Sequence, residues 1–191
     1  APEYKGTMRR CENCHDASKG HADWLPYIET HMDAVACETC HIPQMYAPAI
    51  QTFDWTVVKT NGSAVETCRG IEGAPNDVTS LITGYEPALL NRTNIDGQQL
   101  LAPYNLITSF YWVYDDTNGN TRPVHQIDLE AAYLENGKYN ANIVAAFDDN
   151  GDGQLTEDEL TINSSAKEEA VKTKLTALGL NNVRMEGMVQ P

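Results

Sequence analysis

Two short motifs of the form Cys-x-x-Cys-His lie in the first quarter of this 191-residue chain, at residues 11–15 and 37–41. They use four of its five cysteines and two of its five histidines. In such a motif the two thiols add to the vinyl groups of a haem, and the adjacent histidine coordinates the iron as proximal ligand. The sequence therefore predicts two covalently bound haem c groups. The residues that would hold them are Cys11, Cys14, His15, Cys37, Cys40 and His41.

Two other kinds of site also use Cys-x-x-Cys pairs, namely structural zinc sites and thioredoxin-like dithiols. Neither needs a histidine directly after the second cysteine, and both copies here have one, so the doubled motif favours haem. The fifth cysteine, Cys68, has no following histidine. We expect it to be a buried thiol or, in an exported protein, to pair between chains.

Low-spin haems need a second strong axial ligand, and three histidines remain for this role. His31 lies six residues before Cys37 and is expected to reach the first haem. His21 follows His15 too closely to wrap around the same ring, so it suits the second haem or a haem of another chain. His125 lies far along the chain. If all three bind iron, at least one ligates a haem outside this chain, although any single histidine could instead be an ordinary surface residue. Three methionines could replace histidine, although filling the core is their commoner role: Met8, Met32 and Met45.

Residues 148–159 fit the twelve-residue calcium loop of an EF-hand, with Gly153 at the sharp turn. Hard, anionic oxygen ligands suit Ca²⁺, and the alternative is an acidic turn that binds no metal. Because sensor proteins pair such loops and only one is visible, a structural calcium site is expected. A similar run at residues 115–120 lacks the terminal glutamate and is interpreted as a hairpin turn. The predicted ligands are Asp148, Asn150, Asp152, Gln154, Thr156 and Glu159.

The charge balance excludes some partners. The chain has 27 acidic and 13 basic residues and a net charge of −14, whereas nucleic-acid binding needs a basic surface. No apolar run is long enough for a transmembrane segment. The chain begins Ala1-Pro2, and haem attachment of this type generally occurs outside the cytoplasm. We therefore expect an exported protein, periplasmic or at the cell surface, although the start could equally be a fragment boundary.

The hydrophobic pattern predicts an α+β protein in three consecutive parts. Residues 1–50 form an irregular, haem-packed dihaem segment with one helix at 23–35. Residues 51–125 form a small antiparallel β region, with strands at 53–59 and 106–114. Tight turns are expected at Asn61-Gly62, Asp96-Gly97 and Asn118-Gly119. Residues 126–191 form a helical region around the calcium loop, followed by an extended tail. Its expected helices are 129–136, 141–147, 157–160 and 166–178.

Residues 11–43 resemble a stretch of the octahaem tetrathionate-reductase-like cytochromes. The shared pattern is Cys-x-x-Cys-His, a histidine, Leu25-Pro26, another histidine, and then the run from Val35 to Pro43. Phe53-Asp54-Trp55 and the stretch 101–123 also resemble parts of this wider group. The family implies an exported electron-transfer protein with mostly bis-histidine haems. Because it has eight haem motifs where this chain has two, the resemblance implies a dihaem relative or a piece of a larger assembly.

The function predicted from these features is electron transfer by a dihaem c-type cytochrome. Its partners would be redox proteins or identical subunits. Identical subunits could be joined by inter-chain haem ligation, and repeated subunits would then form an extracellular filament. The alternative is a haem enzyme, or enzyme subunit, that reduces a small sulfur or nitrogen oxyanion. That activity would need an open iron, and the negative charge disfavours anionic substrates. A third interpretation is a calcium-dependent binding module that carries haem.

Overall fold

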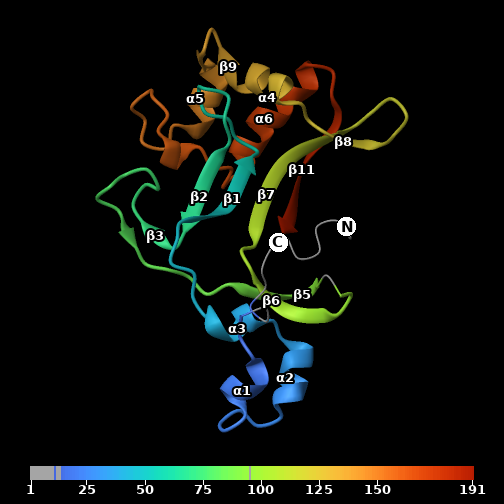
Figure 1. Ribbon diagram of the computed structural model, residues 1–191. Coiled ribbons are helices and arrows are strands. Elements are labelled where there is room, and N and C mark those ends of the chain that lie inside the picture. The colour runs from blue at the N-terminus through green and yellow to red at the C-terminus, as the bar shows by residue number, and fades with distance from the viewer. Residues whose placement is uncertain (1–10, 12–13, 95) are drawn as a thin grey trace. The chain divides into compact units, whose positions relative to one another are not determined.

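The computed structural model describes residues 11, 14–94 and 96–191, and it contains both helices and strands (Figure 1), as the α+β prediction requires. The chain forms two compact units, each built from two separate stretches of sequence. The first unit takes residues up to 48 together with 70–106, and the second takes 49–69 together with 107–191. This division is discontinuous, whereas the sequence pattern suggested three consecutive parts.

Three short helices lie in the first unit: α1 (Ala17–His21), α2 (Ile28–Ala34) and α3 (Cys37–His41). The expected helix over 23–35 forms only in its second half. Pro26 disfavours helical backbone at the residue before it, and Tyr27 then adopts a left-handed conformation with φ 56° directly before α2. Pro26 therefore precedes this helix.

Two hairpins complete the first unit. Strand β3 (Ile71–Glu72) pairs with β4 (Leu81–Ile82), and β5 (Ala88–Thr93) pairs with β6 (Gln99–Tyr104). The β5–β6 turn contains Gly97 at φ 86°, a conformation that favours glycine, so the predicted turn is confirmed there. Val35, at the end of α2, bridges to Leu101 on β6.

A five-stranded sheet lies in the second unit, with strand order β11-β7-β1-β2 and β8 paired with β7 (Figure 1). The predicted turns at residues 61–62 and 118–119 join the antiparallel pairs β1–β2 and β7–β8, which also confirms residues 115–120 as a hairpin turn. The strands are β1 (Ala49–Trp55), β2 (Val65–Arg69), β7 (Ile107–Asp115), β8 (Thr121–Pro123) and β11 (Asn181–Gln190).

The prediction of a purely antiparallel region is wrong, because β1 and β7 pair in parallel from Thr52↔Thr108 to Trp55↔Tyr111. Tight-turn residues reveal only pairs of strands that are neighbours in sequence. The parallel pair joins stretches separated by the whole of residues 70–106, so no local signal reports it. The tail expected to be extended is β11, which pairs antiparallel with β7.

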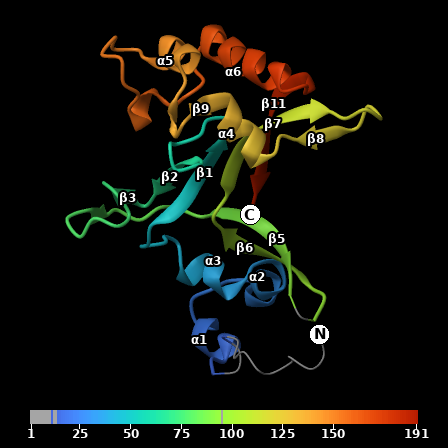
Figure 2. The same ribbon diagram turned by 90° about the horizontal axis from the view of Figure 1, so that it is seen from above.

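Three helices of the second unit pack against one another beside the sheet (Figure 2), namely α4, α5 and α6. Helix α5 has the predicted bounds, α6 is shifted by one residue, and α4 begins three residues earlier than expected. Ser164 caps α6 and Gly179, at φ 92°, follows its end. The bounds are α4 (Gln126–Tyr133), β9 (Leu134–Glu135), β10 (Lys138–Tyr139), α5 (Ala141–Phe147), the 3₁₀ turn η3 (Glu157–Glu159) and α6 (Ser165–Ala177).

The second unit has a hydrophobic core between its sheet and helices, and the short segment after β1 lies inside it. Trp112 Nε1 and the Tyr133 hydroxyl both donate to the Thr56 carbonyl oxygen at 2.8 Å, so these buried polar groups are satisfied. The buried residues of this hydrophobic core are Val57, Val58, Trp112, Leu129, Ala132, Tyr133, Ile143, Phe147, Leu160, Val171, Leu175 and Val183. Within the described part of the chain, no helix has the length and apolar character needed to cross a bilayer.

Candidate functional site

A cavity of about 790 Å³ lies among the N-terminal helices of the first unit, near the upper end of the ~300–1,000 Å³ range of ligand pockets. Both Cys-x-x-Cys-His motifs contribute to its lining, together with two further histidines and several apolar side chains. The sulfur and imidazole residues around it are Cys11, His15, His21, His31, Cys37, Cys40 and His41. The apolar ones include Trp24, Leu25, Met32, Val35 and Ile42.

The second motif is the helix α3 itself, and in the first the His15 amide donates to the Cys11 carbonyl oxygen at 2.9 Å. Residues three and four apart share one face of a helix. Helix α3 therefore brings the two thiols and the histidine of the second motif to the same side. Cys11, Cys14 and Cys40 are exposed and Cys37 is half-buried.

The two residues between the cysteines of the second motif attach α3 to the β5–β6 hairpin. Thr39 Oγ1 donates to the Leu101 carbonyl oxygen at 2.7 Å, and Arg92 donates to Glu38 Oε1 at 2.7 Å. The hydrogen bond from Arg92 lowers the pKa of Glu38 and raises that of Arg92. The Ala36 amide donates to the Leu101 carbonyl oxygen at 2.8 Å. The hairpin thus anchors one side of α3, while the cysteines and His41 line the cavity.

The histidines are divided between the two units. His21 ends α1, with its Nδ1 2.8 Å from the Ala17 carbonyl oxygen and its ring centre 5.8 Å from that of His41. His31 lies on α2 and lines the same cavity, as does His15. The structure therefore brings four of the five predicted haem-ligating histidines to one cavity. His125 belongs to the second unit, where it is exposed and precedes α4.

The remaining sulfur-bearing candidates have other surroundings. Cys68 lies on β2 and is half-buried, so it is less enclosed than the expected buried thiol. The Tyr85 hydroxyl donates to Met45 Sδ at 3.3 Å, and Met32 lines the cavity. Met8 lies outside the described residues.

The chemistry of the cavity fits covalently attached haem. Three of the four motif thiols, those of Cys11, Cys37 and Cys40, lie beside an apolar hollow together with the imidazole of each motif. The hollow also receives two more imidazoles. No lysine or arginine is among the described residues that line it. The described part of the chain contains no group of three or more His, Cys, Asp or Glu side chains placed to hold one metal ion.

The predicted calcium loop is folded around its first and last carboxylates. Asp148 Oδ1 accepts from the Gly151 amide at 2.6 Å, and its Oδ2 accepts from the Gly153 amide at 2.8 Å. Glu159 Oε1 accepts from the Asp149 amide at 3.1 Å, while its Oε2 accepts from the Thr156 amide and hydroxyl at 2.8 and 2.9 Å. The bonds from Thr156 lower the pKa of Glu159.

The two sides of this loop differ. Helix α5 precedes it, as predicted, whereas the last three loop residues form only the single 3₁₀ turn η3, where a helix over 157–160 was expected. Thr156 and Glu159 form a capping box that begins this turn. The chain then leaves the helical path, since the Leu160 backbone is not helical and Leu160 is buried in the core.

Lys167 is a positioning residue that the sequence analysis missed. Its side chain is 2% exposed, and its ammonium group lies 2.7 Å from Asp149 Oδ2 and 3.3 Å from the Glu159 carbonyl oxygen. The ammonium also stands 5.2 Å from the centre of the Phe147 ring. The available signal was helical spacing, because Lys167 precedes the buried Val171 and Leu175 by four and eight residues on α6.

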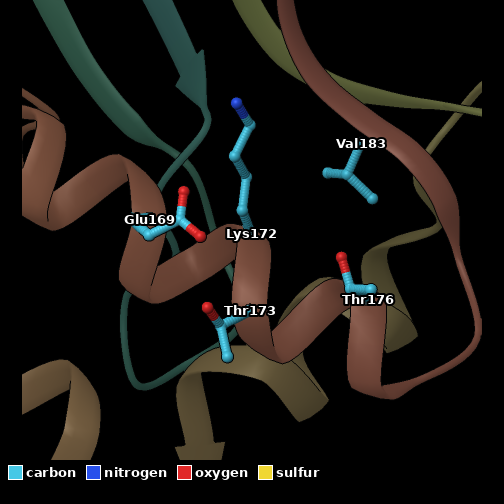
Figure 3. A pocket seen from close by; sticks show the side chains of 5 residues that line it. All are labelled: Glu169, Lys172, Thr173, Thr176 and Val183. Carbon is cyan, nitrogen blue, oxygen red and sulfur yellow. The ribbon is translucent and has the colours of Figure 1, made fainter.

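A second hollow, of about 300 Å³, lies between α6 and β11 (Figure 3). It is lined by Glu169, Lys172, Thr173, Thr176 and Val183. Lys172 pairs with Glu168 on the same helix at 2.8 Å, so its charge is already partnered. This lining has no sulfur or imidazole group, and we assign no chemistry to it.

Comparison with models of known families, with curated proteins and with solved structures finds no match to this chain in any of the three. We therefore infer function from the motifs and from the geometry of the cavity.

Proposed function

We propose that the chain is an exported dihaem c-type cytochrome that transfers electrons. Its exchange partners would be redox proteins or identical subunits, and repeated subunits of this kind would form an extracellular filament. The observation that carries the proposal is that both Cys-x-x-Cys-His motifs and two additional histidines line a single apolar cavity. When bound there, the haems would supply one-electron redox chemistry.

The residues around the cavity have distinct roles in this proposal. Cys11 and Cys14, and Cys37 and Cys40, would hold the two groups by thioether bonds, with His15 and His41 as proximal ligands. His21 and His31 would supply the distal ligands. The apolar lining would exclude water and so help to set the reduction potentials.

The number of histidines supports electron transfer over catalysis. Four histidines at the cavity suffice to occupy both axial positions of two irons, which leaves no coordination position for a substrate. An enzyme acting on a sulfur or nitrogen oxyanion would also need cationic groups near the iron, whereas the described lining includes Asp16 and Glu38 and neither lysine nor arginine.

Two further features fit this proposal. The pattern over residues 11–43 resembles the octahaem tetrathionate-reductase-like cytochromes, whose haems are mostly bis-histidine. His125 is exposed and stands outside the cavity lining, so it is the histidine left to ligate a haem of another copy or partner.

We also propose that residues 148–159 bind a structural Ca²⁺. Asp148, Asn150, Asp152, Glu159, the Gln154 carbonyl and Thr156 would supply the oxygen ligands. The loop backbone already turns around the carboxylates at positions one and twelve, which supports this assignment. The hydrogen bonds that lower the pKa of Glu159 also support the assignment, because calcium binds the charged carboxylate.

Haem attachment can be tested by producing the chain in a host that matures c-type cytochromes. Intact mass and a pyridine haemochrome assay should show two haems per chain. Cys37→Ala with Cys40→Ala should leave one, and Cys68→Ala, as matched control, should leave two. A protein with no covalent haem under these conditions would contradict the proposal.

A further inference from the structure

We propose that His21 and His41 coordinate the same iron, on opposite faces of the haem attached to Cys37 and Cys40. The Ala17 carbonyl would hold His21 in the tautomer that this requires. The inference rests on the proposed function, and it specifies which helix closes which haem.

The separation of the two rings carries this assignment. Their centres are 5.8 Å apart. Two imidazoles on opposite sides of one metal ion have ring centres about 6 Å apart, because each metal–nitrogen bond is about 2 Å and each ring centre lies about 1 Å further out. Across the part of the chain that the structure describes, no second pair of histidine rings shows such a contact.

The hydrogen bond at the other end of the His21 ring supports the same role. His21 Nδ1 lies 2.8 Å from the Ala17 carbonyl oxygen, four residues earlier in α1. A carbonyl oxygen only accepts, so Nδ1 carries the proton and Nε2 keeps its lone pair. Metal-ligating histidines commonly donate their second ring nitrogen to a backbone carbonyl, which fixes both tautomer and orientation. His21 is therefore prepared to bind through Nε2.

Trp24 restricts the ring further. Its Nε1 donates to the Gly20 carbonyl oxygen at 3.0 Å, and its ring lies 5.2 Å from the His21 ring. His21 is thus held between its own helix and an indole, and both residues line the cavity. This environment lowers the entropy that His21 would lose on coordination. With His21 assigned to the second haem, His31 is left to pair with His15 at the first.

The main experiment replaces His21 by alanine in the dihaem protein. We expect one of the two haems to become high-spin and to bind carbon monoxide when reduced, with low-spin character restored by added imidazole. Ser18→Ala is the matched control, because Ser18 is exposed on the same helix and is not part of the cavity lining. It should leave both haems low-spin.

A second set of variants identifies the haem. In the Cys11→Ala, Cys14→Ala background only the second haem is attached, and there His21→Ala should open the iron whereas His31→Ala should not. The reverse result would overturn the inference, as would a low-spin, carbon monoxide-unreactive iron in His21→Ala.

His21→Met provides a second test in case His21→Ala fails to fold. Methionine keeps the iron six-coordinate and should raise the reduction potential of one haem. An unchanged potential would count against the inference. Haem content is measured for the wild type and for every variant. A wild type without covalent haem would contradict the proposed function, whereas normal haem content with an unchanged iron in the His21 variants would contradict only the ligand assignment.

Discussion

The residues between the motif cysteines show how local chemistry and distant support combine. Cys37, Cys40 and His41 are found from their spacing alone, but Glu38 and Thr39 look like arbitrary positions in the sequence. Their partners are Arg92 and the Leu101 carbonyl, 54 and 62 residues later. The spacing therefore predicts which residues line the candidate site, whereas the contacts that position them depend on tertiary structure.

Arg92→Met should slightly destabilise the first unit and alter its response to acid. The Arg92–Glu38 pair is partly exposed, so the expected loss is up to about 1 kcal/mol. Because Arg92 lowers the pKa of Glu38 in the folded state, the pair stabilises the fold above pH 4.5, the ordinary value for glutamate, and this is lost as pH falls through the lower folded pKa.

Thermal unfolding of the haem-bound protein between pH 3 and 6 tests this prediction. Wild type and Arg92→Met should differ at the upper end of this pH range and converge at its acid end. Arg122→Met is the control, because it removes a partly exposed arginine–carboxylate pair, with Asp116, in the β7–β8 turn of the second unit. A constant difference at every pH would show that the Arg92 contribution is not electrostatic.

Residues 141–160 show what pattern matching can predict at the scale of an element. Helix α5 has its predicted bounds, because it depends on local pattern and capping. The end of the loop does not form the predicted helix, because burial of Leu160 in the core ends the helical path after one 3₁₀ turn. The parallel pair β1–β7 is missed for a related reason, since its strands lie far apart in sequence.

Calcium should raise the melting temperature of the second unit, and Glu159→Gln should remove this effect. Ligand at 100 times its dissociation constant adds about 2.7 kcal/mol of stability, which corresponds to roughly 5–10 °C for a chain of this size. The measurement is calorimetry in EDTA and in excess Ca²⁺. Glu157→Gln, two residues earlier and outside the proposed ligands, should keep the shift. Equal melting temperatures with and without calcium in the wild type would contradict the site.

Lys167→Met should destabilise the calcium loop region even without calcium. Methionine keeps the packing on Phe147 but loses the hydrogen bonds to Asp149 and to the Glu159 carbonyl, which leaves a buried acceptor without its donor. The expected cost is about 1–3 kcal/mol. Lys172→Met on the same helix, where the lysine pairs with Glu168 and is partly exposed, should cost less than about 0.5 kcal/mol. Equal denaturation midpoints for the two variants would show that Lys167 does not brace the loop.

The two units of the molecule differ in what stabilises them. The second unit contains the hydrophobic core, whereas the apolar side chains classed as buried in the described part of the first unit are Ala36 and Ala102. So small a core does not offset the entropy of ordering a chain. The faces of bound haem would supply the missing apolar surface. Composition does not reveal these units, because each is assembled from two separate stretches.

This difference predicts unequal behaviour without haem. A variant with all four motif cysteines replaced by alanine should lose protection of the first unit against proteolysis while the second unit stays resistant. Limited digestion followed by mass spectrometry would locate the cuts, with early cleavage expected in residues 14–48. The haem-bound wild type is the control. Equal resistance of both units in the haem-free variant would show that the first unit is stable by itself.

The central claim is that histidines of this chain close both irons, so that the protein conducts electrons and does not catalyse a reaction at an open haem. Optical spectra of the reduced protein before and after addition of carbon monoxide test it most directly. We expect two haems per chain and an unchanged Soret band. A band that shifts for either haem in the wild-type protein would contradict it, because a coordination position would then be open to a small ligand.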